Sequence, residues 1–334
     1  MAYLKKLTAL ITTGILGISL LTGCSSTSEN SSDSDIKEIG ITQLVEHPAL
    51  DKTREGFLKA LEDNGYKDGE NIKIDYQNAQ NDNPTSQTIA GNFANDGKDL
   101  IYAISTPSAQ AAYNATKDIP VLFTAVTDPV EAGLVESLEK TGNNVTGTSD
   151  FLSIDKSMSL VKKLAPEAKK VGVIYSTSEV NSKVQVDALK DYSSKNGYEV
   201  LEKGISTSSE ANQAITSLLG KVDVLYVPTD NLVVSSMPII AKAAADANLP
   251  VIASDEGSVT SGALACGGVD YYELGYKTGE MAVKILNGEA APSDIAVESM
   301  EEPVITMNED TMKSLGIEKP SDTEVTIVKT EINE

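Results

Sequence analysis

The sequence predicts an α/β protein of two Rossmann-like lobes, each a doubly wound parallel sheet, joined by a hinge. From residue 36 onward, short apolar runs alternate with amphipathic stretches, as in βα units on a parallel sheet. The chain has 334 residues, a length at which two hydrophobic cores are expected rather than one. The two halves also resemble each other, since each has a strand, a helix and a second strand that begins at Pro-Val. The alternative is a chance similarity between βα units.

The first 35 residues are predicted to be processed and flexible rather than folded. Lys5 and Lys6 precede an apolar run over 7–21, which is too short for a membrane-spanning helix and is typical of a signal peptide over 1–23. The run ends in Leu21-Thr22-Gly23-Cys24, which resembles the lipobox of bacterial lipoproteins and implies lipidation of Cys24; an ordinary secretory signal is the alternative. Residues 24–35 are nearly all polar and are predicted to form a flexible tether.

Charge and cysteine content exclude several classes of partner. The formal net charge is −22, and losing Lys5 and Lys6 with the signal peptide makes it more negative, which disfavours nucleic acid and anionic lipid. Cys266 is the one cysteine left once Cys24 is lipidated, so no intrachain disulfide is expected. Cys266 lies among small residues and is predicted to be a buried thiol rather than a reactive one.

The expected elements alternate along the whole chain. Strands are predicted at 39–44, 72–76, 100–104, 121–125, 145–149, 171–175, 199–205, 222–227 and 251–253. Helices are predicted at 48–64, from Pro84, and at 109–116, 184–195, 209–219 and 238–247. A long helix at 274–286, strands at 295–299 and 304–307 and a short helix at 309–315 follow. In a two-lobed protein this last segment must return to the first lobe and cross again.

Catalysis is poorly supported by the residues present. His47 is the only histidine, so it would have to be the base of any Ser-His-Asp triad. The sequence has no nucleophile elbow, phosphate-binding loop or dinucleotide fingerprint, and too few histidines and thiols for a zinc site. We therefore predict neither an enzyme nor a metal or cofactor site.

Polar residues at predicted strand ends favour binding of a small ligand. Ser105, Thr106, Pro107 and Ser108 follow one strand and open a helix, where free N–H groups and hydroxyls suit a carboxylate; plain helix capping is the alternative. Four acids follow other strands and could accept an ammonium group: Asp128, Asp150, Asp230 and Asp255. His47 and Pro48 join the first strand to the first helix and could bracket an aromatic ring, or His47 could merely cap the helix.

Six segments in order resemble a known family over about residues 36–317. They are Gln43-Leu44-Val45-Glu46-His47-Pro48-Ala49-Leu50-Asp51, Ser105-Thr106-Pro107-Ser108-Ala109-Gln110, Thr127-Asp128-Pro129, Asn144-Val145-Thr146-Gly147-Thr148-Ser149-Asp150, Ser178-Glu179-Val180-Asn181-Ser182 and Pro228-Thr229-Asp230-Asn231. The family is that of ABC-type substrate-binding lipoproteins associated with tryptophan and tyrosine uptake.

This resemblance implies a type I periplasmic-binding fold that closes on an aromatic amino acid. One lobe would comprise 36–148 plus about 271–300, and the other 149–270 plus about 301–330. Thr106 and Ser108 would hold the ligand carboxylate, and Asp230, with Asp128 or Asp255, its amine. His47 and Leu44 would flank the side chain, while Ser178, Glu179, Asn181 and Ser182 would close over it. The full set of expected ligand-binding residues is Gln43, Leu44, His47, Pro48, Ser105, Thr106, Pro107, Ser108, Thr127, Asp128, Asp150, Ser178, Glu179, Asn181, Ser182, Thr229, Asp230, Asn231, Asp255 and Glu256.

The resemblance also implies partners and leaves alternatives open. The expected partners are an amino acid ligand, the permease and ATPase subunits of an importer, and the membrane through the Cys24 lipid, with the chain itself a monomer. The sequence has no tryptophan, so an aromatic clamp would use other residues, and it does not distinguish tyrosine, tryptophan and phenylalanine as ligands. Alternatives are a binding protein for a nucleoside or other small polar molecule, and a surface adhesin.

Overall fold

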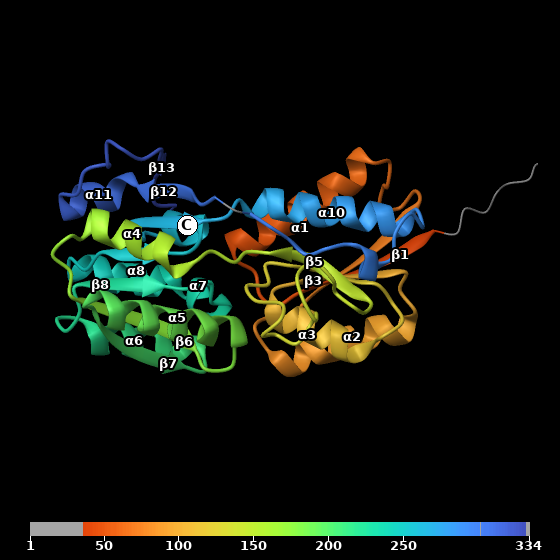
Figure 1. Cartoon of the computed structure of the whole chain (residues 1–334), viewed down its shortest axis with the longest axis horizontal. Coiled ribbons are helices and arrows are strands. Elements are labelled where there is room, and N and C mark those ends of the chain that lie inside the picture. The colour runs from red at the N-terminus through yellow and green to blue at the C-terminus, as the bar shows by residue number, and fades with distance from the viewer. Residues whose placement is uncertain (1–35, 301, 332–334) are drawn as a thin grey trace, which may run out of the picture. The chain divides into compact units, whose positions relative to one another are not determined.

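The computed structural model describes residues 36–300 and 302–331 (Figure 1). The predicted signal peptide, the lipidation at Cys24 and the tether up to residue 35 lie outside the described residues. Across the two described ranges, no helix is both long enough and apolar enough to cross a membrane.

The strands form two separate sheets. The first has the order β11-β5-β4-β3-β1-β2, and all its neighbours run parallel. Its strands are β1 (Lys37–Gln43), β2 (Ile72–Asn78), β3 (Leu100–Ile104), β4 (Val121–Thr124), β5 (Val145–Ser149) and β11 (Glu298–Ser299). The second has the order β13-β12-β10-β9-β8-β6-β7, in which β12 runs antiparallel to β10 and the other neighbours are parallel. Its strands are β6 (Lys170–Ser176), β7 (Glu199–Ile205), β8 (Val224–Val227), β9 (Val251–Ala253), β10 (Ala265–Gly268), β12 (Val304–Asn308) and β13 (Thr326–Val328).

Helices connect the strands and cover both faces of each sheet. They are α1 (Pro48–Asp63), α2 (Asn83–Asp96), α3 (Thr106–Ala115), α4 (Ile154–Leu164), α5 (Val180–Asn196), α6 (Ala211–Leu218), α7 (Asn231–Ser235), α8 (Met237–Asp246), α9 (Glu256–Thr260), α10 (Tyr271–Leu286) and α11 (Glu309–Leu315). In Figure 1, α1 and α10 lie on one side of the first sheet and α2 and α3 on the other.

Alternation along the buried strands builds four hydrophobic cores, one on each face of each sheet. In β3, Leu100, Tyr102 and Ile104 pack with α1 and α10, whereas Ile101 and Ala103 pack with α2 and α3. The strand β8 divides in the same way between α4 and α5 on one face and α6 and α8 on the other. Strands buried on both faces are the mark of doubly wound parallel sheets. The predicted α/β fold with two such lobes is confirmed.

The segment that contains α10 and β11 returns from the second sheet to the first. The helix α10 packs closely along α1, and glycines make the approach possible: a Cβ on Gly275 would lie 1.9 Å from the Thr53 carbonyl oxygen, and one on Gly56 would lie 2.0 Å from that of Tyr272. Within the described residues the chain passes from one sheet to the other after β5, after β10 and after β11.

Several short elements were not predicted, and α3 begins earlier than expected. The sequence pattern missed α4, α7, α9, β10 and β13. The helices α7 and α9 have five residues each, too few to show a helical period, and Asp230 and Asp255 cap them. The strand β10 is Ala-Cys-Gly-Gly, with none of the usual strand formers. The helix α3 begins at Thr106 rather than 109, because Pro107 suits a first turn. Cys266 is buried, as predicted.

Candidate functional site

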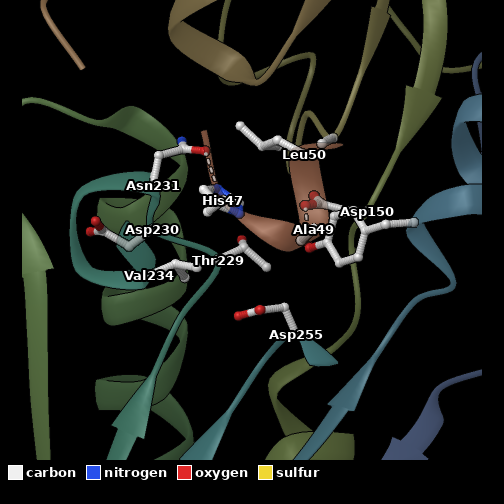
Figure 2. Close-up of a pocket in the computed structure, with 11 residues that line it drawn as sticks. His47, Ala49, Leu50, Asp150, Thr229, Asp230, Asn231, Val234 and Asp255 are labelled. Atoms are coloured by element: carbon white, nitrogen blue, oxygen red, sulfur yellow. Dashed lines mark hydrogen bonds between the residues drawn. The ribbon is translucent and has the colours of Figure 1, made fainter. Parts of the chain in front are cut away.

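A cavity lies where strands of both sheets end at their carboxyl edges (Figure 2). It is lined by His47, Ala49, Leu50, Ala125, Asp150, Thr229, Asp230, Asn231, Val234, Asp255 and Tyr271. These residues follow β1, β4 and β5 of the first sheet and β8, β9 and β10 of the second. Its empty volume is about 300 Å³ when the part open to solvent is included. The carboxyl edge is where open parallel sheets bind ligands.

Six of the expected ligand-binding residues line this cavity: His47, Asp150, Thr229, Asp230, Asn231 and Asp255. Sequence reasoning missed the other five: Ala49, Leu50, Ala125, Val234 and Tyr271. The four apolar ones look like core residues, so the sequence carries no signal for them. Tyr271 follows β10, and recognising that strand would have placed it at the same edge of the sheet.

His47 occupies the N-cap position of α1, but its side chain does not cap the helix. The imidazole instead reaches across the cavity, where Nε2 lies 3.5 Å from Oδ1 of Asn231 (Figure 2). The alternative that His47 merely caps the helix is therefore wrong. Burial lowers the pKa of His47, which favours a neutral ring at pH 7.

Asp150 follows β5 and is buried in the cavity wall. Its Oδ2 accepts a hydrogen bond of 3.1 Å from the Tyr271 hydroxyl, while Oδ1 has no hydrogen-bond partner among the described residues. Burial raises the pKa of Asp150 to about 6. A buried carboxylate oxygen that is left without a donor is costly, and it is therefore a strong candidate to receive one from a ligand.

Asp230 also lines the cavity, but backbone donors already hold its carboxylate. Oδ1 accepts from the backbone N–H of Val233, and Oδ2 accepts from that of Ser176. Neighbouring Glu179 accepts from the Asn181 amide and from the backbone and side chain of Asn231. Burial raises the pKa of Glu179 to about 7, and it also raises that of Asp230. These two acids hold the loops of the second lobe together, and the expectation that Asp230 takes the ligand amine gains no support from its contacts.

The first turn of α3 has buried hydroxyls that point to a missing partner. Ser105, Thr106 and Ser108 are at most 2% exposed, and none of the three hydroxyls has a hydrogen-bond partner in 36–300 or 302–331. Ser105 has a φ of 88°, a strained value outside glycine, and its side chain does not cap the helix. Plain capping therefore does not explain this Ser-Thr-Pro-Ser sequence. These residues do not line the cavity of Figure 2, but Ser105 N–H bonds the Thr124 carbonyl, next to Ala125 in the cavity wall.

The remaining expected residues have other surroundings. Leu44 is buried in a hydrophobic core and does not line this cavity. Gln43 is buried with its amide fully bonded inside the first lobe. Asp128 is partly exposed and accepts from the N–H groups of Val130 and Glu131. The others also lie outside the cavity lining: Pro48, Pro107, Thr127, Ser178, Glu179, Asn181, Ser182 and Glu256.

Besides the bond between Tyr271 and Asp150, further polar contacts join residues that follow strands of different sheets. The hydroxyls of Thr127 and Thr229 lie 2.9 Å apart, and His47 approaches Asn231. On α1, Lys52 donates to Glu256 of α9 over 3.1 Å.

The buried acids predict an unusual dependence of stability on pH. Asp150 and Glu179 have pKa values near 6 and 7 in the folded state, above their ordinary values of 3.8 and 4.5. A raised folded-state pKa stabilises the fold below the unfolded pKa, and this stability is lost as pH rises through the folded value. These two acids favour pH 5 over pH 8 by about 4 kcal/mol, and buried His47 opposes them, because its lowered pKa costs stability at acid pH. The ligand-free protein should therefore be more stable at pH 5 than at pH 8 in urea unfolding, by on the order of 2 kcal/mol. Equal stability at the two pH values would contradict these protonation states.

The geometry suits recognition of a small polar ligand. The cavity offers a free carboxylate oxygen, a neutral imidazole and apolar walls. In the described ranges no three His, Cys, Asp or Glu residues cluster in a way that could hold a metal ion. Such a site can bind an organic cation or zwitterion through charge-assisted hydrogen bonds.

Comparison with known proteins supports the same conclusion. The family model for ABC transporter substrate binding proteins matches residues 38–330. The chain is 63% identical to the tyrosine-binding protein of Clostridioides difficile, over 98% of this chain and 97% of the relative.

Two solved structures are informative. A ligand-free, open substrate binding protein with adhesive properties from Clostridium difficile is 67% identical, with a TM-score of 0.69 over 89% of this chain and all of the other. A Streptococcus pneumonia protein in complex with L-Trp is 35% identical, with a TM-score of 0.83 over 87% and 99% of the two chains. The structure of the less similar sequence, the L-Trp complex, overlays better on this chain.

Proposed function

The chain belongs to the ABC transporter substrate-binding proteins, and from that membership we propose that it captures a free aromatic amino acid, with tyrosine the first candidate. As a family member it is extracytoplasmic, binds a small molecule and works with the other components of a transporter. The tyrosine-binding relative and the L-Trp complex favour an aromatic amino acid. The unpaired oxygen of Asp150 is the observation in this structure that carries the proposal.

We assign the ligand ammonium group to Asp150 rather than to Asp230. Among the described residues Asp150 Oδ1 has no donor, whereas both oxygens of Asp230 accept from backbone N–H groups. A ligand ammonium would satisfy Asp150 and neutralise a buried charge. A hydrogen bond between charged groups in such a site contributes about 1.5–3 kcal/mol.

We assign the ligand carboxylate to the first turn of α3. The hydroxyls of Thr106 and Ser108, which lack partners in the described part of the chain, are joined there by the backbone N–H groups that every helix leaves free at its N-terminus. The helix dipole also favours an anion at this end. Strain at Ser105 is consistent with a backbone shaped for a ligand.

The ligand side chain would lie against the apolar part of the cavity wall. Ala49, Leu50 and Val234 supply this surface, and the His47 ring can stack on an aromatic group. The sequence has no tryptophan that could take this role. A neutral imidazole can also exchange a hydrogen bond with a phenolic hydroxyl, which favours tyrosine over phenylalanine.

Capture would involve closure of two lobes. We propose that 36–148 with about 271–300, and 149–270 with about 301–330, move as two bodies about the three crossings. The Thr127–Thr229 and Lys52–Glu256 contacts would form on closure. We also propose that the lipid on Cys24, which lies outside the described residues, tethers the protein to the membrane. We propose further that the protein acts as a monomer.

Thermal denaturation with each of the twenty amino acids tests the proposal. A ligand present at a hundredfold excess over its dissociation constant stabilises the folded state by about 2.7 kcal/mol. Tyrosine or another aromatic amino acid should raise Tm, and glycine and alanine should not. No response to any amino acid would contradict the proposal and favour a nucleoside or another polar ligand.

A second candidate function is adhesion at the cell surface. It is favoured by the 67% identical relative, which is described as having adhesive properties. Binding of ligand-free and ligand-loaded protein to host cells would test it. Binding in neither state would dismiss adhesion and leave amino acid capture unaffected.

A further inference from the structure

The single arginine of the chain lies next to the segment that carries the single histidine. Lysine and arginine total 27, of which 26 are lysine and one is Arg54. Arg54 is on α1, two turns after His47, and its side chain is 23% exposed. Arg54 is therefore the one position of this lysine-rich sequence that has a guanidinium group.

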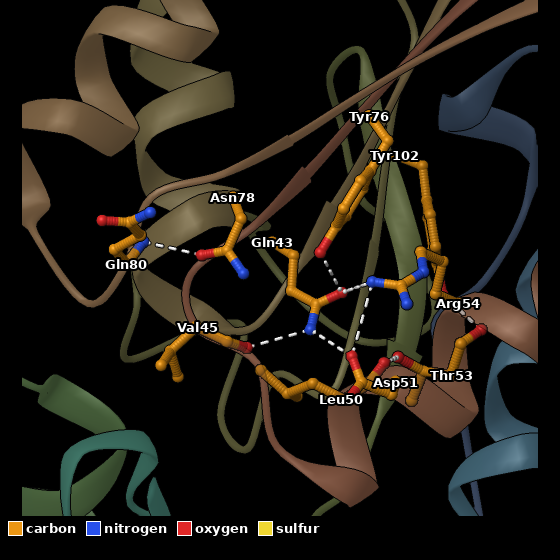
Figure 3. Close-up of polar contacts among 10 residues, drawn as sticks. All are labelled: Gln43, Val45, Leu50, Asp51, Thr53, Arg54, Tyr76, Asn78, Gln80 and Tyr102. Atoms are coloured by element: carbon orange, nitrogen blue, oxygen red, sulfur yellow. Dashed lines mark hydrogen bonds and ion pairs between the residues drawn. The ribbon is translucent and has the colours of Figure 1, made fainter.

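Arg54 bonds a buried glutamine that holds both ends of the segment 44–50 (Figure 3). The guanidinium donates to Gln43 Oε1 over 2.7 Å, and its Nη1 lies 3.4 Å from Asp51 Oδ1. The Gln43 amide nitrogen then donates to the Val45 carbonyl over 2.9 Å and to Asp51 Oδ1 over 2.8 Å. Gln43 precedes the segment, Val45 lies within it and Asp51 follows it.

Tyr76 of β2 completes this group, which we call the Arg54 network: Gln43, Asp51, Arg54 and Tyr76. The guanidinium carbon lies 4.3 Å from the centre of the Tyr76 ring, and the hydroxyl lies 3.4 Å from Gln43 Oε1. One side chain therefore meets an amide oxygen, a carboxylate and an aromatic face. A planar guanidinium can do this, whereas the ammonium of lysine is a point donor without a face to stack.

The segment held by the Arg54 network supplies His47, Ala49 and Leu50 to the cavity. Backbone bonds fix its start, since the carbonyls of Gln43 and Leu44 accept from Ala79 and Asn81. The Gln43 side-chain amide also fixes the next residue but one, because it donates a hydrogen bond to the Val45 carbonyl. We propose that Arg54 is a positioning residue for ligand affinity: through Gln43 and Asp51 it fixes the segment 44–50, and so the place of the His47 ring. This inference rests on the proposed function, but its structural part can be measured without ligand.

Arg54→Lys is the direct test, because it keeps the charge and removes the planar fork. His47 is the only histidine, so one imidazole NMR signal reports its surroundings. In ligand-free protein we expect that signal to shift and the amides of 44–50 to exchange faster with solvent. We expect affinity for the aromatic amino acid to fall about tenfold, the loss of one charge-assisted hydrogen bond. Lys59→Met is the matched control, since Lys59 is on the same helix and pairs only with Glu62 and Asp63 in the described structure.

The possible outcomes separate the positioning role of Arg54 from the proposal that the ligand is an aromatic amino acid. A lower Tm for Arg54→Lys with an unchanged His47 signal, unchanged exchange over 44–50 and unchanged affinity would overturn the positioning role. If wild type binds no aromatic amino acid while the signal and the exchange still change, the positioning of the segment stands and the ligand is wrong. Should Arg54→Lys fail to fold, Asp51→Asn decides, because it keeps an acceptor for Gln43 but removes the ion pair with Arg54. The readout is then the amide exchange of 44–50, because the charge of Asp51 also acts on His47 directly. Unchanged exchange would overturn the proposal.

Discussion

A Thr106→Val, Ser108→Ala double variant is expected to bind the amino acid at least about a hundredfold more weakly, while its ligand-free form becomes more stable. Each hydroxyl would donate to the ligand carboxylate, and hydrogen bonds to a charged group contribute about 1.5–3 kcal/mol each. Without ligand the same hydroxyls are buried and have no partner in the described residues. Replacing them by apolar groups of similar shape should therefore stabilise the fold by on the order of 1 kcal/mol.

Titration calorimetry and urea unfolding of the same samples measure the two effects. Ser86→Ala is the matched control, because Ser86 on α2 is also buried and its hydroxyl lacks a partner among residues 36–300 and 302–331. This control should gain stability and keep full affinity. If the double variant kept wild-type affinity, the carboxylate would have to be held elsewhere than at α3.

Asp150→Asn is expected to reduce affinity about a hundredfold at pH 7.5 and to change its pH dependence. Asparagine is nearly isosteric and can still accept from the Tyr271 hydroxyl, so the fold should be preserved. The ionised carboxylate is the form that attracts an ammonium group, and the pKa of Asp150 is about 6. Wild-type affinity should therefore fall as pH decreases below 6, by about tenfold per unit.

The affinity of Asp150→Asn should be nearly constant over pH 4.5–6 (a range of about one and a half units below the wild-type pKa). Asp128→Asn is the control, because Asp128 also follows a strand but lies outside the cavity lining. A wild-type affinity independent of pH, or equal effects of the two substitutions, would exclude Asp150 as the ammonium site.

The fold was largely predictable from the sequence, because strands buried on both faces appear as apolar runs. The strand ranges 100–104, 145–149, 199–205 and 251–253 match the structure in both bounds. The elements missed were those without a pattern, such as the five-residue helices α7 and α9 and the glycine-rich β10. Their ends carry Asp230, Asp255 and Tyr271 to the cavity, so the gaps in the predicted fold lie next to the site.

The site was predictable in its residue types but not in their roles. Asp150 and Asp230 both follow strands, and the sequence does not show which carboxylate is satisfied by backbone donors. Which carboxylate is satisfied depends on α7 and on the end of β6, which meet only in the folded chain. Gln43 is a similar case, since its partners come from two elements that lie far apart in the sequence: Asp51 and Arg54 from α1 and Tyr76 from β2.

Binding of L-tyrosine and two truncated analogues tests the central claim most directly. Tyramine lacks the carboxylate, and 3-(4-hydroxyphenyl)propanoate lacks the ammonium group, while both keep the phenol. In this account the α3 hydroxyls bind the carboxylate of the zwitterion and Asp150 binds its ammonium group. Calorimetry should therefore show tight binding of L-tyrosine and at least about a hundredfold weaker binding of either analogue. An analogue that binds as tightly as L-tyrosine would contradict the account.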